Sequence, residues 1–393
     1  MKEKIWQTIK NEKRSIIVLA VAAVVFLAAF FYIHSEDILK GGGKIFWVYG
    51  DELVEFEVAT VTSIESEEME VEETADGAYS GNQELAVTVK SGRYKGEDMV
   101  AYNYFGPYYG VPVAVGDSVT LTLKTHADGT RYATVYEVNR IPVLVVVLLL
   151  FIAIVVLVGG RTGFKSLAGL TFTIFCLFTI LIPILFKGAP TVLSTVFICT
   201  YIAFVSFTIL GGVHRKTMSA FLGTVSGMLI AMLLAIVVQR IAKIDGLRLE
   251  DAEPLLQLKL YSGATIKLRG LLTAGIIISS LGAVMDVAMS ISSSIEEIHA
   301  ANASLSRVEL FRSGMNVGRD MVGTMTNTLI LAFLGSEFTL IIFMYSRELT
   351  FYHLFSTAFV SLETISALSS SLGMVLAIPL TAMISSTLVS KKK

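Results

Sequence analysis

The segment VLVVVLLLFIAIVVLV, residues 143–158, contains no polar or charged side chain. An α-helix crosses a bilayer with about 20 mostly apolar residues, whereas a buried strand of a soluble protein is far shorter. Other apolar segments occur at residues 15–33, 166–186, 191–210, 220–238, 268–290, 321–345 and 354–388. The sequence therefore predicts an α-helical polytopic membrane protein with about eight transmembrane helices.

The composition of the whole chain supports this fold class. Of the 393 residues, 54% are hydrophobic and only 16% are charged, which is more apolar material than the core of one soluble domain can bury. The formal net charge of −2 gives no sign of a nucleic-acid partner. Both cysteines, Cys176 and Cys199, lie in apolar segments, so a disulfide framework is excluded.

Basic residues predict the orientation of the chain, because lysine and arginine concentrate in cytoplasmic loops. Several of them precede the first apolar segment, which places the N-terminus in the cytoplasm. Alternation then brings the later basic clusters to the cytoplasmic side, at Arg161, Lys165, Arg215, Lys216, Arg307, Arg312 and residues 391–393. The predicted protein therefore has both termini in the cytoplasm of a cell whose membrane it crosses several times.

Two segments leave alternatives open. The basic segment 240–269 would lie outside, against the charge rule, and an interfacial amphipathic helix around residues 255–266 would account for it. The first apolar segment is either an uncleaved anchor, which we favour, or a cleaved signal peptide. The anchor is favoured because the segment ends in bulky aromatic residues rather than in a small-residue cleavage site.

Between the first two apolar segments the pattern changes to the alternation typical of half-buried strands, as in ELAVTVK at 84–90 and SVTLTLK at 118–124. Asp128-Gly129 predicts a hairpin turn after the second of these. Five or six strands of this kind predict a small barrel or sandwich, with an OB-like barrel as the preferred fold. The predicted organisation is a cytoplasmic N-terminus and anchor (1–34), an extracytoplasmic all-β domain (35–141) and a seven-helix transmembrane domain (142–393).

Asp286 is the first candidate functional residue, because an ionisable side chain within a transmembrane helix is costly and needs a compensating partner or water. At helical spacing, Ser279 and Ser290 share its stripe together with Gly275 and Gly282. The stripe indicates either close packing of a neighbouring helix or one wall of an ion or substrate pathway. Close packing does not explain the carboxylate, so we favour the pathway.

The start of the segment at 321–345 is unusually polar for a transmembrane helix. Asp320, Thr324, Asn327 and Thr328 share one of its faces. Their oxygens, together with Asp286, are suited to a hard cation or a proton relay, although the pattern does not identify a metal. The structural alternative is that Asp320 caps the helix N-terminus.

Glu363 lies well inside the last apolar segment and is a candidate proton or cation carrier. Its structural alternative is a neutral glutamic acid that forms a hydrogen bond with a neighbouring helix. Glu337 carries less weight because it lies nearer the outer end of its segment, where its side chain can reach the lipid headgroups.

Two features mark the predicted β domain. The first is an aromatic segment around a Gly-Pro turn, which indicates a contact loop for a partner or a surface resting on the membrane, at Tyr102, Tyr104, Phe105, Tyr108 and Tyr109. The second is an acidic stretch at 65–76, which indicates a solvated edge or an attraction for cations or a basic partner.

The chain contains no sequence motif for catalysis. HExxH and GxxxxGK[ST] are absent, and the five histidines are scattered along the sequence. The sequence therefore predicts that the protein is not an enzyme, and it indicates no cofactor.

Three stretches resemble a known family: GAVMDVAMS at 282–290, SGMNVGRD at 313–320 and MTNTLILA at 325–332. They look like the signature of the YibE/F-like family of bacterial membrane proteins, and the order of anchor, external β domain and helix bundle is also similar. The resemblance implies a permease-like membrane protein. It also implies that the motif residues are Asp286, Arg319, Asp320, Thr324, Asn327 and Thr328.

Two functions follow as expectations from the residues. The first is a secondary transporter or permease, coupled to protons or cations, that uses the intramembrane carboxylates to move a small solute. The alternative is a membrane receptor or assembly subunit that does not transport and whose β domain binds a ligand or partner. Expected partners are the lipid bilayer, the solute or ion, and either a second copy of the chain or a second membrane protein, because small-residue helix faces favour association.

Overall fold

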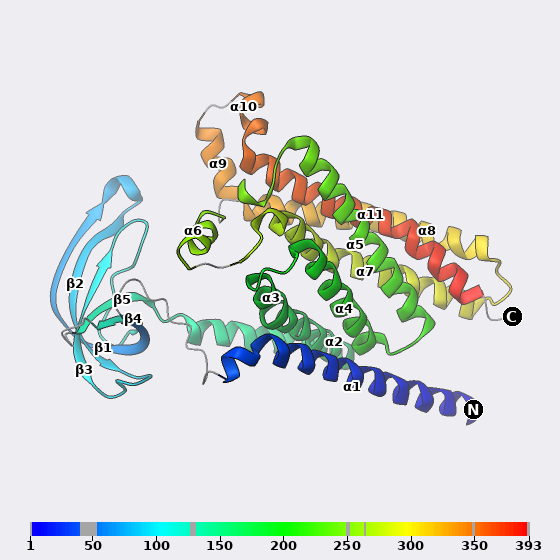
Figure 1. Ribbon diagram of the computed structural model, residues 1–393, viewed down its shortest axis with the longest axis horizontal. Coiled ribbons are helices and arrows are strands. Elements are labelled where there is room, and N and C mark those ends of the chain that lie inside the picture. Colours follow the sequence, from blue (N-terminus) through cyan, green and yellow to red (C-terminus); the bar gives the residue numbers. More distant parts are fainter. Residues whose placement is uncertain are drawn as a thin grey trace. The chain divides into compact units, whose positions relative to one another are not determined.

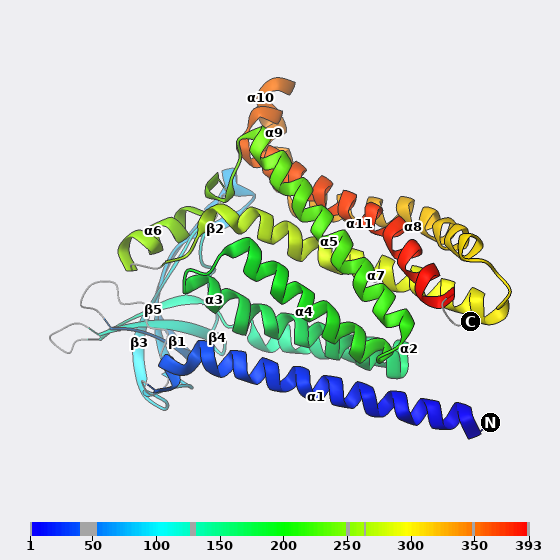
Figure 2. The same cartoon turned by 45° about the vertical axis from the view of Figure 1, so that its right-hand side comes forward.

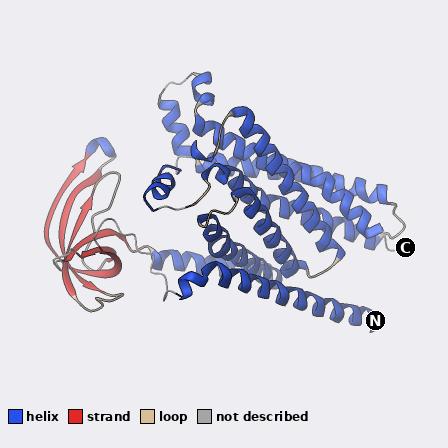
Figure 3. Ribbon diagram, viewed as in Figure 1, coloured by secondary structure: helices blue, strands red, loops and turns tan. Residues whose placement is uncertain are grey.

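A computed structural model describes residues 2–39, 53–125, 131–248, 252–262, 265–347 and 350–390 (Figure 1). The chain forms two compact units: Asp37–Ile154, and Met1–Glu36 together with Val155–Lys393. The first unit contains all the described strands, and the second contains most of the helices (Figure 3). The first unit therefore includes the start of the apolar segment at 143–158.

The β domain is a closed five-stranded barrel with the strand order β1-β2-β3-β5-β4. Its strands are β1 (Leu53–Glu72), β2 (Ala78–Val89), β3 (Asp98–Phe105), β4 (Ser118–Thr125) and β5 (Arg131–Val138). β3 pairs with β5 in parallel, and the other pairs are antiparallel. The predicted all-β domain is confirmed as a small barrel. Asp128-Gly129 lies outside the described residues, but β4 and β5 pair as a hairpin would require.

Alternation along the strands builds the barrel core. Leu85 and Val87 of β2, Ala101 of β3, and Leu121 and Leu123 of β4 are almost completely buried. Each is flanked by side chains that face outward, because successive residues of a strand point to opposite faces. The acidic half of β1 pairs with the start of β2, and its glutamates at 65, 67, 68 and 70 are exposed, as expected of a solvated edge.

A buried polar pair fixes the segment that follows β3. Gln83 and Asn103 are each only 1% exposed. The side-chain carbonyl of Gln83 accepts hydrogen bonds from Asn103 Nδ2 (2.9 Å) and from the Val113 N–H (3.0 Å). Gln83 Nε2 donates to the Val113 carbonyl (3.0 Å), and Asn103 Nδ2 donates to the Val111 carbonyl (3.0 Å). The barrel interior therefore holds the chain just beyond the aromatic segment in place.

The helices follow the predicted apolar segments. Their bounds are α1 (Lys2–Leu39), α2 (Ile141–Cys176), α3 (Ile182–Phe186), α4 (Thr191–Gly211), α5 (Arg215–Ala242), α6 (Ala252–Ser262), α7 (Leu271–Ala301), α8 (Arg307–Ser336), α9 (Phe338–Ser346), α10 (Phe351–Ser356) and α11 (Ala358–Ser390). A π-helical turn, Leu177–Leu181, joins α2 to α3. Within the described residues, six helices are long and apolar enough to cross a membrane, or seven if the bent pair α8–α9 is one span.

The stretch Ile141–Phe186 reverses direction at Gly160. Gly160 has a φ of 53°, which favours glycine, and a non-helical ψ of −133°. A Cβ on Gly163 would lie 2.2 Å from the carbonyl oxygen of Val155. Residues eight apart in a straight helix are separated by about 12 Å along its axis, so the chain must turn back between them.

Two predicted span boundaries are wrong. The span expected at 321–345 begins earlier, at Arg307, and breaks before α9; the span expected at 354–388 is divided into α10 and α11.

Ser306 caps α8 in a capping box with Glu309, whose N–H donates to Ser306 Oγ (3.3 Å). Asp320 therefore lies inside α8 and does not cap it. The segment expected to form a helix around 255–266 contains α6, which spans Ala252–Ser262.

The first helix packs against the helical unit. Tyr201 donates its hydroxyl to the Ala22 carbonyl (2.6 Å), and the Val213 N–H donates to Ser15 Oγ (3.0 Å). The ring of Phe26 lies against the rings of Phe172 and Phe175. The start of α1 and the end of α11 lie at the same end of this unit, where α5 and α8 also begin (Figures 1 and 2).

Glycines allow α5, α7 and α11 to approach closely. A Cβ on Gly227 of α5 would lie 2.6 Å from the Ala377 Cβ and 2.8 Å from Val284 Cγ1. A Cβ on Gly223 would lie 2.1 Å from Thr381 Oγ1. The GxxxG spacing in α5 therefore serves helix association, because only a glycine leaves room for the neighbouring backbone.

Candidate functional site

The transmembrane segment that follows α7 is broken. α8 and α9 are bent by 62° at their junction, and Glu337 is the single residue between them. The main chain of Glu337 serves both helices, since its N–H donates to the Phe333 carbonyl (3.2 Å) and its carbonyl accepts from the Ile341 N–H (3.0 Å). In membrane proteins, broken helices occur where the backbone lines a cavity.

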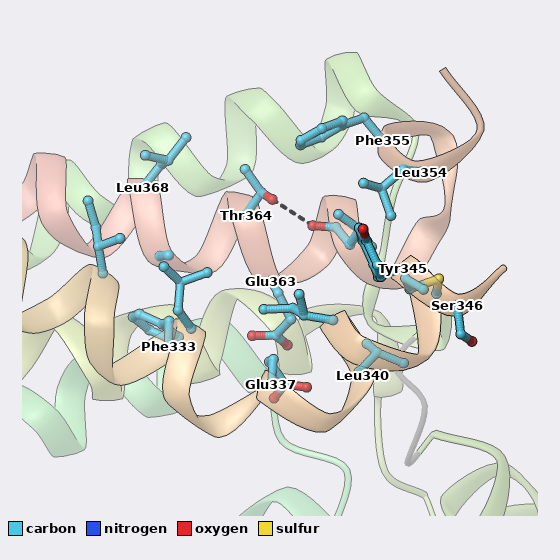
Figure 4. Close-up of a pocket in the computed structure, with 16 residues that line it drawn as sticks. Phe333, Glu337, Leu340, Tyr345, Ser346, Leu354, Phe355, Glu363, Thr364 and Leu368 are labelled. Carbon is cyan, nitrogen blue, oxygen red and sulfur yellow. Dashed lines mark hydrogen bonds between the residues drawn. The ribbon is translucent and has the colours of Figure 1, made fainter. Parts of the chain in front are cut away.

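A cavity of about 760 Å³ lies at this break (Figure 4). It is lined mainly by apolar side chains from α8, α9, α10 and α11. The lining residues are Ile330, Phe333, Leu334, Glu337, Leu340, Ile341, Met344, Tyr345, Ser346, Leu354, Phe355, Val360, Glu363, Thr364, Ala367 and Leu368. Its volume falls in the range of about 300–1,000 Å³ that is usual for small-molecule sites.

Two carboxylates meet in this cavity. Figure 4 shows the side chains of Glu337 and Glu363 pointing toward one another from the helix break and from α11. The hydroxyl of the neighbouring Thr364 donates to the Val360 carbonyl (2.7 Å) of its own helix. Two facing carboxylates in apolar surroundings repel each other unless a proton or a cation lies between them. The arrangement is therefore suited to binding positive charge.

Glu363 stands out in the sequence as a carboxylate inside an apolar segment, whereas Glu337 is less conspicuous. The signal that marks Glu337 is the preceding Gly335-Ser336, since glycine and serine interrupt a helical pattern. A carboxylate directly after a helix interruption lies at a break, not at the end of a regular span.

Much of the α7 stripe that contains Asp286 is exposed. Asp286 and Ser279 are exposed on α7, Ser290 is half-buried, and a Cβ on Gly275 or Gly282 would meet nothing within 4 Å. The two glycines of the stripe therefore pack against no neighbouring helix. One contact leads from the stripe to α11, where the hydroxyls of Ser279 and Ser370 lie 2.8 Å apart.

The polar face of α8 also points outward. Asp320, Thr324, Asn327 and Thr328 are all exposed. The threonine hydroxyls form hydrogen bonds within their own helix, Thr324 to the Met321 carbonyl (3.2 Å) and Thr328 to the Thr324 carbonyl (2.9 Å). The Asp320 carboxylate and the Asn327 amide make no such hydrogen bond within the described part of their helix. In a bilayer this face needs water or another protein chain against it.

The structure does not gather all three predicted carboxylates in one place. Among the described residues, the cavity that contains Glu363 is lined by neither Asp286 nor Asp320. The described residues also contain no cluster of three or more His, Cys, Asp or Glu side chains able to hold a metal ion. The best-defined site is therefore the pair Glu337 and Glu363.

In the barrel, one predicted contact residue is wrong. Phe105 is only 1% exposed, because it follows Ala101 and Asn103 on the inward face of β3. Tyr108 is 97% exposed, and Tyr104 and Tyr109 are exposed as well. The aromatic surface therefore lacks Phe105.

Tyr132, which the sequence pattern does not mark, belongs to the same aromatic surface of the barrel. The ring of Tyr132 stacks on that of Tyr102 with centroids 5.4 Å apart, and its hydroxyl lies 3.2 Å from that of Tyr104. The hydrogen bond with Tyr104, followed by burial, raises the pKa of Tyr132 to about 12. Tyr132 was missed because parallel pairing of β3 with β5 cannot be inferred from local sequence.

The long apolar helices, the broken helix pair and the barrel define a multi-pass membrane protein with an inserted β domain. Residues 147–391, more than half of the chain, match the model of the YibE/F-like protein family, and the chain belongs to that family, as its motifs implied. No curated protein and no solved structure matches the chain.

Proposed function

We propose that this protein is a secondary transporter of the cell membrane that couples the movement of a small solute to that of a proton or cation. The observation that supports this most is the facing pair Glu337 and Glu363 in a cavity at a helix break. Ionisable residues at membrane depth are rare and mark ion or substrate pathways. Asp286, Ser279 and Ser290 on α7, and the polar residues of α8, are further candidates for the pathway.

Coupling follows from the charge of the pair. With a proton or cation bound, the two carboxylates are compensated and the cavity can be closed to water. With none bound, their repulsion and the cost of removing charge from water favour a hydrated, open site. A site that closes only when its charge is compensated changes its access to the two sides of the membrane only when loaded, which is what coupled transport requires.

The test uses proteoliposomes and a panel of small solutes under an imposed proton or sodium gradient, with trapped pyranine, a pH-sensitive dye, reporting proton movement and radioactive sodium reporting sodium movement. We expect solute-dependent proton or sodium movement in the wild-type protein and its loss in Glu363→Gln and Glu337→Gln, which keep the side-chain shape and remove the charge. Glu297→Gln at the exposed end of α7 is the matched control and should retain the flux. Equal flux in all four proteins would refute the role of the pair.

We further propose eight transmembrane spans with both termini in the cytoplasm and residues 35–141 outside. The reversal at Gly160 divides Ile141–Phe186 into two crossings, and the bent pair α8–α9 supplies one more. The start of α1 and the end of α11 lie at one end of the helical unit, as an even number requires (Figure 2).

The expected result in intact cells is that a cysteine introduced at exposed Tyr108 reacts with an impermeant maleimide, whereas one at exposed Arg161 does so only after lysis. Both would be placed in a chain with Cys176→Ala and Cys199→Ala. Labelling of the cysteine at position 161 in intact cells would show that the reversal at Gly160 faces outward, contrary to the proposed topology.

A second candidate function is a receptor or assembly subunit that does not transport. The specific observation in its favour is the tyrosine surface of the barrel, which we propose to be OB-like, a fold that often presents aromatic side chains to ligands. In the proteoliposome experiment, correct insertion of the wild-type protein without any gradient-dependent flux would favour this function.

A further inference from the structure

The lining of the cavity narrows the class of ligand that it can hold. Among the described residues that line it, the charged side chains are Glu337 and Glu363 alone, with no lysine, arginine or histidine. A half-buried pair of carboxylates in apolar surroundings repels anions, and a zwitterion would leave its own negative group without a partner. The charge of the site therefore selects a cation.

The size and polarity of the cavity argue against a bare inorganic ion as its main occupant. A hard cation takes about six oxygen ligands at about 2.0–2.6 Å. Most of the lining consists of hydrocarbon and aromatic side chains, and the Thr364 hydroxyl already donates to the Val360 carbonyl. A cavity of about 760 Å³ instead has room for an organic molecule with an apolar body.

Aromatic rings add to the attraction for an organic cation. Phe333, Tyr345 and Phe355 come to the cavity from α8, α9 and α10 (Figure 4). The negative face of an aromatic ring attracts a weakly hydrated cation, and this attraction is strongest away from water. Such rings suit a quaternary ammonium or phosphonium whose charge is surrounded by carbon.

The cavity wall formed by α9 and α10 is thin. Neither helix contains a buried residue, and Ile341, Tyr345 and Phe355 are exposed although they line the cavity. An amphipathic ligand dissolved in the bilayer could therefore reach the carboxylates between these helices. This route suits a lipophilic cation, which partitions into membranes before it binds.

We infer that the cavity at the α8–α9 break binds lipophilic organic cations, with Glu337 and Glu363 holding the positive charge and the surrounding hydrocarbon and aromatic side chains holding the apolar body. The inference rests on the proposed transport function and deepens it by naming the substrate class. It concerns binding, which can be measured without transport.

The experiment measures equilibrium binding of radiolabelled tetraphenylphosphonium to the purified full-length protein in lipid nanodiscs. We expect saturable binding that weakens about tenfold or more in Glu363→Gln and in Glu337→Gln, and that disappears in the double variant. Glu297→Gln should bind as the wild type does. Melting temperature and size-exclusion profile would establish that each variant is folded.

A ligand of the same shape provides the second control. Tetraphenylborate matches tetraphenylphosphonium in size and apolar surface but carries a negative charge, so it should not compete for the site. Equal binding of both ions, or unchanged phosphonium binding in the double variant, would show that the cavity binds apolar molecules without discriminating between positive and negative charge. Absence of saturable binding to the wild-type protein would overturn the inference outright.

The outcomes distinguish this inference from the proposed function. If the protein binds tetraphenylphosphonium through the pair but shows no gradient-dependent flux, the substrate class stands and transport fails. If the pair supports solute-dependent flux while the phosphonium does not bind, transport stands and the substrate class is wrong.

Discussion

Replacing Gly227 with leucine is expected to abolish the folded helical unit. Even a methyl group at this position would lie 2.6 Å from the Ala377 Cβ and 2.8 Å from Val284 Cγ1, and 3.2 Å from the carbonyl oxygen of Gly373. Backbone and buried side chains cannot move away cheaply, because α5, α7 and α11 form the centre of the unit. The free energy of unfolding should fall by about 3 kcal/mol or more, the upper end for overpacking of a core.

The measurement is size-exclusion chromatography in mild detergent together with thermal melting. We expect Gly227→Leu to aggregate or to elute with a broad profile. Gly275→Leu is the matched control, since a Cβ on Gly275 meets nothing within 4 Å and the residue lies on the exposed stripe of α7. Wild-type behaviour of Gly227→Leu would mean that α5 and α11 do not approach as closely as described.

Truncation of Gln83 to alanine should destabilise the barrel strongly. The change leaves the N–H and carbonyl of Val113 and the amide of Asn103 without the partner that they have in the barrel interior. Each buried polar group left unsatisfied costs about 1–3 kcal/mol. A small domain has a total stability of only about 5–15 kcal/mol, so the loss is a large part of it.

Limited proteolysis of the full-length protein measures this effect. We expect rapid cleavage between β3 and β4 in Gln83→Ala, where the Val111 and Val113 main chain loses its anchor. Asn82→Ala is the control, because the Asn82 side chain donates a hydrogen bond to Glu68 (3.3 Å) on the exposed face of the same strand. Equal cleavage of both variants would show that the Gln83 network does not hold this segment.

The sequence predicted the parts of the fold that depend on local pattern. Uninterrupted apolar segments predicted the long helices, and the alternation of apolar and polar residues predicted the barrel strands. Both patterns are local, because whether a residue is apolar depends directly on whether its own side chain is buried. The aromatic composition of the segment around Phe105 indicates a contact surface, but Phe105 itself is buried. Its alternation with Ala101 and Asn103 would have placed it inside the barrel.

The candidate site was only partly predictable. Glu363 was identified because a carboxylate inside an apolar segment is conspicuous, but its partner depends on a 62° bend between α8 and α9. Such a bend is set by tertiary packing and not by the spacing of apolar residues. For the same reason the sequence could not show that Asp286 and Asp320 lie outside the cavity of Glu363.

The short helices α9 and α10 bury none of their residues. In a bilayer, shifting them exchanges one hydrocarbon environment for another, so few favourable contacts are lost in the movement. Two arrangements of this part of the protein can therefore be close in free energy. The charge state of Glu337 could then decide between them, since a charged side chain favours the more hydrated arrangement and a compensated one the drier.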